Sequence, residues 1–480
     1  MLLYERAPEG LRFVCYLPNG TPSSGACGPG TVVGLPGGAL SSARNAISAD
    51  GTRIFWSIPS DSSNPAQAPG PIYARIDGTE TREVSSSVAP DPAWYWTAAD
   101  DGSKVIFAFA SGTHKDELYE FDVDAQKATL IAKGVDGPMG ASGDASRLYF
   151  ASTEDLDGAG PASKGAHNLY FYDANAAGGA SAFTFVMALA NADLAGTTAT
   201  GAPVEEIPAQ RSARVTPNGL HVTFTAVAPP PSGYDNRSAE NDIPAQEVYR
   251  YDAGAGELAC ISCNPSGARP TVGEIGGAFP AAARIQGWEA LGHAPRVISD
   301  DGSRVFFESF EALVPRDTNG AWDVYQWEEP GKGTCDKADP TYGEEAGGCV
   351  DLISSGESPA KSTFLDADPS SDNIFFSTQS SLVGQDYGLN DVYVARVGGG
   401  FGEPQPRPVC EGDACQGPSA APVPPTPSSS AYRGPEAVKA KRCPRGKRRV
   451  RRAGRVRCVP RKRKGSKARR RAAAKRRASR

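Results

Sequence analysis

A short pattern of polar and apolar positions recurs six times along the chain. A polar turn and a basic residue are followed by an alternating apolar triplet, most clearly at residues 50–56, 101–107 and 301–307; looser copies end at Phe150, Phe224 and Phe376. An Asp-Gly or Asn-Gly pair favours the positive backbone angles of a tight hairpin, and the triplets are rich in β-branched and aromatic residues. Each copy therefore predicts a hairpin that leads into a buried strand.

A second motif, an apolar residue followed by tyrosine, comes after each hairpin motif. Its six copies contain Tyr73, Tyr119, Tyr170, Tyr249, Tyr325 and Tyr393. A further extended run follows, as at residues 129–131 and 350–353. Leu3-Tyr4-Glu5 is a seventh tyrosine motif against six turn motifs. We therefore expect the chain to begin in the middle of a repeat whose first half, with any export signal, lies upstream.

Four strands per repeat is the composition of one β-propeller blade. The apolar residues that head the triplets lie 51, 43, 74, 83 and 69 positions apart, and the shorter intervals fit a blade of about 40 to 50 residues. A lone sheet cannot bury both faces, so blades close into a ring. We predict an all-β fold, a six-bladed β-propeller of four-stranded antiparallel blades over residues 1–400. We expect the strand at residues 11–17 to pair with the last repeat and close the ring.

These motifs resemble the repeats of TolB-like six-bladed propellers, a WD-repeat-like group. In that group a Pro-Asp-Gly or Asp-Asp-Gly turn precedes an apolar strand and a strand that reads Asp-Val-Tyr. Residues 323–325 and 391–393 match best, whereas Asp144-Ala145 and Ser370-Ser371 lack the turn glycine. The resemblance covers residues 1–400 and implies binding or scaffolding, often outside the cytoplasm, with no single chemistry.

The ten cysteines fall into five near neighbours. They are Cys15 with Cys27, Cys260 with Cys263, Cys335 with Cys349, Cys410 with Cys415, and Cys443 with Cys458. Local pairs in even number predict short disulfide-closed loops and an oxidising compartment, so we expect an extracellular or cell-surface protein. The first five residues lack the basic and apolar regions of a signal peptide. The sequence contains no run of eighteen apolar residues, so it predicts no transmembrane segment.

The chain has two regions of opposite net charge. After residue 432, 24 basic residues face one acidic residue, whereas the rest of the chain holds 26 basic and 54 acidic residues. Residues 401–435 are rich in proline and serine and predict an extended, disordered linker, and residues 436–480 form a polycationic tail with a small disulfide hairpin. The candidate polyanion-binding residues are Arg448, Arg449, Arg451, Arg452, Arg455, Arg457, Arg461, Lys462, Arg463, Lys464, Arg469, Arg470 and Arg471.

A polycation binds polyanions by releasing counterions, with little sequence selectivity. For an exported chain, we expect the tail to retain the protein on anionic cell-wall or envelope polymers. Nucleic-acid binding is an alternative, although no aromatic residue that could stack on bases follows Tyr432. Two further alternatives are that the tail folds back onto the acidic propeller or only keeps the chain soluble.

Candidate chemistry within the propeller is sparse. Asp317, Asn319 and Asp323 offer oxygen ligands in a turning loop, which makes calcium the one cofactor suggested, and loop capping by the same carboxylates is the alternative. Zinc at Cys260 and Cys263 would need two more ligands, and nothing nearby in sequence supplies them. Neither a Gly-x-Ser-x-Gly elbow nor a His-Glu-x-x-His helix occurs.

We therefore predict a monomeric, non-catalytic binding scaffold. Its propeller face would take an unidentified protein or small-molecule ligand. A metal-dependent, lactonase-like hydrolase with a site at the mouth of the central channel is the alternative that the sequence leaves open.

Overall fold

The computed structural model describes residues 2–400 except 9, 36–37, 43, 61–68, 159, 195–212, 276–278, 287–294, 385 and 387. Further along the chain it describes residues 445, 447–452 and 455–460. The chain divides into two compact units, Met1–Phe401 and Gly402–Arg480. They correspond to the repeats and to the region that holds the predicted linker and tail, and each unit is considered by itself.

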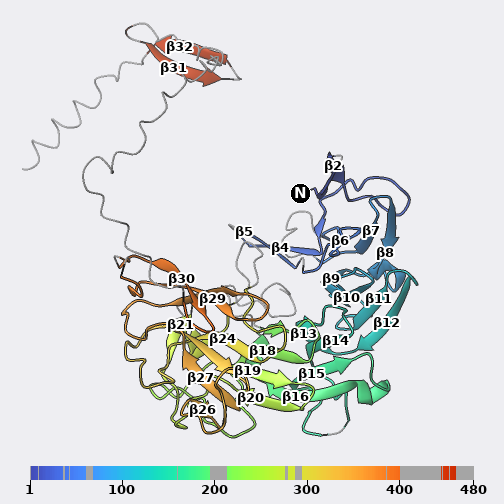
Figure 1. Ribbon diagram of the computed structural model, residues 1–480. Coiled ribbons are helices and arrows are strands. Elements are labelled where there is room, and N and C mark those ends of the chain that lie inside the picture. The colour runs from blue at the N-terminus through green and yellow to red at the C-terminus, as the bar shows by residue number, and fades with distance from the viewer. Residues whose placement is uncertain are drawn as a thin grey trace, which may run out of the picture. The chain divides into compact units, whose positions relative to one another are not determined.

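Six antiparallel sheets follow one another along the described part of the first unit (Figure 1). The first holds β3 (Gly28–Pro29), β6 (Arg53–Ser57), β7 (Ile72–Ile76) and β8 (Glu80–Glu83). The second holds β9 (Ala93–Ala98), β10 (Lys104–Phe109), β11 (Leu118–Asp122) and β12 (Lys127–Ala132). The third holds β13 (Val135–Ala141), β14 (Arg147–Ser152), β15 (His167–Asp173) and β16 (Phe183–Leu189).

The other three sheets vary more in strand number. The fourth holds β17 (Ala213–Val215), β18 (His221–Ala226), β19 (Glu247–Asp252) and β20 (Glu257–Cys260). The fifth holds five strands, β23 (Ala283–Arg284), β24 (Arg304–Ser309), β25 (Asp323–Glu328), β26 (Tyr342–Gly343) and β27 (Gly348–Leu352). The sixth holds three described strands, β28 (Thr363–Ala367), β29 (Asn373–Thr378) and β30 (Asp391–Arg396). The predicted all-β propeller architecture is confirmed.

Short hairpins and helical turns complete the described elements. The hairpins are β1 (Tyr4–Ala7) with β2 (Gly10–Phe13), β4 (Thr31–Leu35) with β5 (Gly38–Ser42), β21 (Gly273–Ile275) with β22 (Phe279–Ala281), and, in the second unit, β31 (Lys447–Arg452) with β32 (Arg455–Pro460). The helical turns are η2 (Ser85–Ser87), η3 (Gly179–Ala182) and α1 (Asn191–Leu194).

The two sequence motifs meet inside every sheet. The last residue of each apolar triplet, on the second strand, is the register partner of the motif tyrosine on the third strand. The pairs are Trp56 with Tyr73, Phe107 with Tyr119, Phe150 with Tyr170, Phe224 with Tyr249, Phe307 with Tyr325, and Phe376 with Tyr393. Their ring centroids lie between 4.6 Å, in the first pair, and 6.5 Å, in the third. Such aromatic pairs stabilise a sheet beyond the burial of their area.

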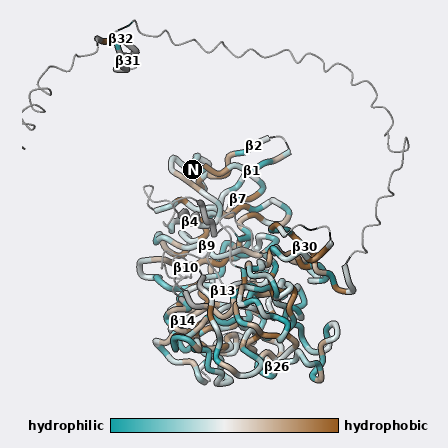
Figure 2. The backbone as a smooth tube through the Cα atoms, turned by 90° about the vertical axis from the view of Figure 1, so that its left-hand side faces the viewer, coloured by the Kyte–Doolittle hydropathy of each residue, from teal (hydrophilic) through white to brown (hydrophobic). Residues whose placement is uncertain are grey.

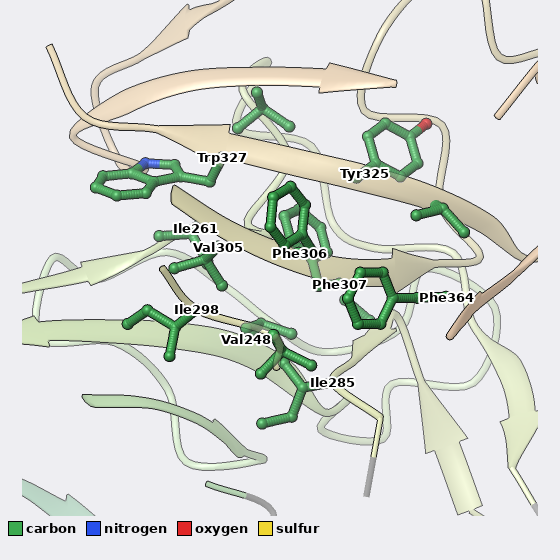
Figure 3. Packing of buried hydrophobic residues seen from close by; sticks show 14 of the residues in the cluster. Val248, Ile261, Ile285, Ile298, Val305, Phe306, Phe307, Tyr325, Trp327 and Phe364 are labelled. Atoms are coloured by element: carbon green, nitrogen blue, oxygen red, sulfur yellow. The ribbon is translucent and has the colours of Figure 1, made fainter. Parts of the chain in front are cut away.

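Strands of the inner sheets are buried on both faces, so neighbouring sheets pack on one another. Every residue of β9 and of β24 is buried, and Figure 2 shows hydrophobic segments recurring along the first unit. Figure 3 shows Val248 and Ile261 of the fourth sheet near Val305 and Ile298 of the fifth. Phe306 stacks on Phe364 of the sixth sheet at 5.5 Å between centroids. Burial of each such side chain contributes roughly 1.5 to 3 kcal/mol.

The turns between first and second strands link consecutive sheets. A backbone amide just before one turn donates to the carbonyl at the same position of the next turn. These bonds are Ala49 to Asp100 (2.7 Å), Asp100 to Gly143 (2.7 Å), Gly143 to Pro217 (2.8 Å) and Asp300 to Pro369 (3.1 Å). Pro217 has no amide hydrogen with which to continue the series, and there Arg250 Nε donates to the Gly302 carbonyl at 3.0 Å instead. This series of bonds fixes the spacing of the sheets.

The basic residue after the turn strengthens the same junctions. Arg53, Arg147 and Arg304 each reach a turn carbonyl of the next sheet, at Gly102 (3.0 Å), Asn218 (2.9 Å) and Ser371 (3.3 Å). The departures from the turn motif keep its geometry, since Ala145 and Ser371 hold positive φ values of 54° and 58°. The hairpin interpretation is therefore correct even where the glycine is missing.

The expected pairing for ring closure is wrong. β2 pairs with β1, with Tyr4 opposite Phe13, and β29 is the one neighbour of β30 among the described strands. The physical reason lies in the segment that follows β2. Val14 and the Cys15–Cys27 disulfide pack on the first sheet against Ile54, Trp56 and Tyr73. The N-terminal segment therefore covers a sheet face and does not extend the edge of the sixth sheet.

Three of the predicted disulfides are confirmed: Cys15–Cys27, Cys260–Cys263 and Cys335–Cys349. The third closes the segment that supplies the extra strand β26 of the fifth sheet. Cys458 is also disulfide-bonded. Cys410, Cys415 and Cys443 lie outside the described residues, as does most of the predicted linker and tail.

The turn glycines offer a matched pair of substitutions. Gly51 and Gly302 have φ values of 74° and 75°, but a Cβ at Gly51 would meet nothing within 4 Å, whereas one at Gly302 would lie 2.2 Å from His221 Cδ2. We expect Gly51→Ala to lower the unfolding free energy by about 1 to 2 kcal/mol through backbone strain alone. Gly302→Ala should cost at least about 1 kcal/mol more, because it also forces two sheets apart. Chemical denaturation measures both, and equal losses would contradict the tight junction.

Candidate functional site

A groove opens where loops of the fourth and fifth sheets meet. Its volume is ≈ 740 Å³. The lining residues are Asn264, Pro265, Ser266, Ala312, Leu313, Val314, Pro315, Arg316, Asp317, Pro340, Thr341, Val350 and Asp351. They come from the segment after β20, the β24–β25 loop and the strands β26 and β27 with their approach. Loops held by a rigid scaffold are the usual place for binding residues in such folds.

The predicted calcium loop forms part of this groove. Tyr325 Oη donates to Asp317 Oδ2 at 2.5 Å, and Asn319 Nδ2 donates to Asp323 Oδ2 at 2.6 Å. Ser354 Oγ donates to the other oxygen of Asp323 at 2.5 Å. Asp317 and Asp323 are buried, and burial raises the pKa of Asp317. Asp323 and Asn319 are thus neighbours, and their carboxylate and amide groups are used to fix the loop.

Calcium at this loop would have to compete with these internal donors. The site therefore stays a prediction, and titration calorimetry of Ca²⁺ onto the folded chain tests it. Asp317 and Asp323 each accept a hydrogen bond from a strand or loop side chain, and the loop-capping alternative stays a prediction beside the calcium site.

Two further acids, Glu247 and Glu311, lie close to the groove. The sequence alone does not indicate that they are neighbours. Asn264 Nδ2, from the groove wall, donates to Glu311 Oε1 at 2.6 Å, and Ser262 Oγ donates to Glu247 Oε2 at 2.6 Å. The second oxygen of each carboxyl, Glu311 Oε2 and Glu247 Oε1, is buried without a hydrogen-bond partner in the described part of the chain. Burial raises the pKa of Glu311 to about 7.

Glu247 and Glu311 influence each other. Burial raises the pKa of Glu247 well above its usual value, and the neighbouring Glu311 raises it further. Burial, Glu247 and Glu311 also raise the pKa of Tyr234, whose hydroxyl donates to the Ala268 carbonyl at 2.8 Å. Nothing in the local sequence flags Glu311, since it reaches this place through the contact between two sheets. The sequence feature that comes closest to indicating Glu311 is its position in a loop just after a buried strand.

Basic side chains stand on the first strands of the fourth and fifth sheets. Arg214 is buried and donates to the carbonyls of Pro295, Ala213 and Gln286, and burial together with Arg44 lowers its pKa to about 9. Arg284 pairs with the fully buried Glu308 at 2.5 Å and lies over the Trp322 ring at 4.7 Å. Within the described residues, the group of metal-ligating side chains found is Glu247, Cys260 and Cys263.

No family model and no curated protein matches the chain. Solved structures do match. The likeness is to β-propellers. TolB proteins are among them.

Three of these structures illustrate the range. TolB from Acinetobacter baumannii is 15% identical, with a TM-score of 0.26, and the match covers 68% of this chain and 57% of that one. The putative TolB from Agrobacterium tumefaciens is 13% identical, with a TM-score of 0.29, and the match covers 80% of this chain and 93% of that one. The β-propeller domain of the Trilobed protease from Pyrococcus furiosus is 9% identical, with a TM-score of 0.34, and the match covers 72% of this chain and 79% of that one. Peptidases also occur among the matches. Likeness at this level carries no argument about activity.

The raised pKa of Glu311 predicts a pH dependence of stability. Its folded-state pKa, about 7, lies above the ordinary value of 4.5. Its protonation therefore stabilises the fold below about pH 4.5, and this contribution is lost as pH rises through 7. Because Gln is neutral at every pH, Glu311→Gln should lose less stability than the parent chain between pH 5 and about 8. Thermal unfolding in a pH series measures the difference.

Glu117 provides a control of opposite sign. It accepts hydrogen bonds from Lys133 and Tyr119, and these bonds outweigh burial and lower its pKa to about 2. Glu117→Gln should therefore lose stability at pH 7 and approach the parent chain as pH falls toward 2. Parallel pH profiles for the parent chain and Glu311→Gln would contradict the assignment.

Proposed function

We propose that this chain is a non-catalytic binding protein that works outside the cytoplasm and is retained on anionic cell-surface polymers by residues 436–480. The disulfides within the propeller support an oxidising compartment, since such bonds are rare in the cytosol. Among the described residues, no helix has the length and apolar character needed to cross a membrane.

The observation that carries the proposal is the basic hairpin of strands β31 and β32. Five of the six residues of β31 and two of the six residues of β32 are Lys or Arg, and Arg452 is the register partner of Arg455. Like charges directly opposite one another destabilise a strand pair. A polyanion would supply the missing counter-charge, so the hairpin would gain stability when it binds one. Counterion release from the polymer then provides most of the binding free energy.

The groove on the first unit supports a ligand-binding role for the propeller. It combines apolar residues such as Leu313 and Val350 with polar ones such as Asn264 and Asp351. A concave surface with a few polar groups suits a small molecule or a protein segment. Its ligand would then be presented at the surface to which the C-terminal residues attach the chain.

Nucleic acid is the second candidate partner, because it is also a polyanion. The same hairpin would bind phosphates by the same counterion release. The absence of aromatic residues after Tyr432 argues for binding without base recognition. A metal-dependent hydrolase would instead need a divalent cation held by carboxylates at the ring axis. On the described first strands, Arg214 and Arg284 are each held by neighbouring groups. Two acids, Asp136 of β13 and Asp366 of β28, also stand on first strands, and they accept hydrogen bonds from His167 and from the Arg296 amide.

Deletion of residues 436–480 tests retention. At low salt, the full chain should sediment with isolated envelopes or with a polyanion such as polyglutamate, and the deletion should remain in the supernatant. Because binding depends on released counterions, the full-chain affinity should fall by at least about tenfold between 50 and 200 mM salt.

A charge-matched variant separates charge from shape. Replacement of Arg448, Arg449, Arg451 and Arg452 by Gln keeps the hairpin length and should weaken binding, whereas replacement by Lys should not. Exchange of polyglutamate for single-stranded DNA of equal charge compares the two partner classes. A deletion chain that still binds envelopes would overturn retention by the tail.

A further inference from the structure

Three side chains that can ligate a metal ion meet at the end of the fourth sheet. The carboxylate of Glu247 and the Sγ atoms of Cys260 and Cys263 all lie within 4.8 Å of one another. Each residue is at most 2% exposed. The two sulfurs are joined as a disulfide. Glu247 is thirteen positions before Cys260, which is why the cysteine spacing alone did not reveal a third ligand.

The pairing of β19 with β20 brings these residues together. Tyr249 is the register partner of Cys260, and the Ile261 amide then donates to the Val248 carbonyl at 2.9 Å. The ladder therefore continues past the strand and places Ser262 next to Glu247. Ser262 Oγ accepts from the Val248 amide at 2.8 Å and donates to Glu247 Oε2 at 2.6 Å. The glutamate is thus fixed beside both sulfurs.

An unpartnered oxygen points to a ligand at this place. Glu247 Oε1 is buried and accepts no hydrogen bond from the described residues, although its sister oxygen does. A buried polar atom without a partner costs about 1 to 3 kcal/mol. Closure of the disulfide removes both S–H groups that could otherwise donate to this oxygen. The closed form therefore carries a cost that the open form can relieve.

We propose that Glu247, Cys260 and Cys263 form a redox-gated site for a soft divalent cation of the Zn²⁺ class. The disulfide keeps the site closed, and its reduction exposes two sulfur ligands and one oxygen ligand. Cys-x-x-Cys is an ordinary spacing for zinc ligands. In a tetrahedral site, ligand atoms about 2.0 to 2.3 Å from the ion lie about 3.3 to 3.8 Å apart, so the three groups, within 4.8 Å of one another, need only small shifts once the disulfide opens. Thiolates select such ions over Ca²⁺ and Mg²⁺.

The chemistry balances with a thiol as the reductant. Two thiol molecules exchange with the Cys260–Cys263 bond, which takes up two electrons and two protons, and the reductant leaves as its own disulfide. The cation then binds both cysteines as thiolates and Glu247 as a carboxylate, so binding releases the protons that these groups hold and strengthens as pH rises. Water takes the fourth position.

The groove lies next to the site, although none of the three ligands lines it, so reductant and ion reach the buried sulfurs only when the adjoining groove wall moves. Asn264 directly follows Cys263 and lines the groove of ≈ 740 Å³. The same residue holds Glu311, whose charge influences Glu247. Opening of the disulfide therefore bears on the wall of the groove as well as on the metal ligands.

Cobalt binding to the full chain tests the proposal. Co²⁺ bound to thiolates absorbs in the near ultraviolet, whereas Co²⁺ bound to oxygen alone does not show this band. We expect no band from the oxidised chain and a band that saturates at one Co²⁺ per chain after phosphine reduction, with Zn²⁺ displacing it. Glu247→Gln should weaken Co²⁺ binding by at least about tenfold. Cys263→Ser should abolish the band, and Cys349→Ser, in another disulfide, should leave it unchanged.

Disulfide content in a thiol redox buffer provides a measurement that does not depend on the variants folding. Alkylation followed by mass spectrometry counts the reduced fraction of each pair with and without Zn²⁺. The ion should increase the reduced fraction of Cys260 and Cys263 and leave Cys335 and Cys349 unchanged. An equal increase at both pairs, no increase, or a cobalt band that survives Cys263→Ser would overturn the proposal.

Discussion

The aromatic pair between the second and third strands is the interaction on which the rest of the propeller depends. It gives each sheet two facing aromatic rings, both buried in pairs such as Phe307 with Tyr325. The tyrosine hydroxyl then reaches the loop between the same strands. Tyr249 donates to Ala228 and Tyr325 to Asp317 in this way. One residue type therefore both fills the core and shapes the loops from which the groove is made.

The turns at the opposite ends of these strands determine the angle and spacing between sheets. Apolar faces attract one another without direction, so packing alone does not fix how far one sheet is displaced along the next. The amide-to-carbonyl bonds from turn to turn do fix it. Where Pro217 interrupts the series, Arg250 takes over by bonding Gly302 and lying over Trp327 at 4.6 Å. Basic residues in the motif thus serve the junctions.

The sequence predicts the repeat well because its signals are local. Asp301-Gly302 and Val305-Phe306-Phe307 specify a turn and a strand within seven residues, and near-neighbour cysteines need no knowledge of topology. The sequence does not predict the partner of the N-terminal strand correctly, because two alternatives bury similar apolar side chains. One is pairing with β30, and the other is covering the first sheet through Val14 and Cys15. The sequence does not state which surface the buried residues face. The glycine-free turns at Ala145 and Ser371 show that context can hold a positive φ without the preferred residue.

The groups with unusual electrostatics escape prediction for a related reason. Glu247 begins β19 of the fourth sheet, whereas Glu311 lies in the loop that follows β24 of the fifth. Their raised pKa values arise from burial at a junction, which exists only after the sheets have packed. Once the strand register is known, however, the pairing of Tyr249 with Cys260 places Glu247 beside the disulfide without further assumption. Topology is therefore the step that converts a cysteine pair into a candidate three-ligand site.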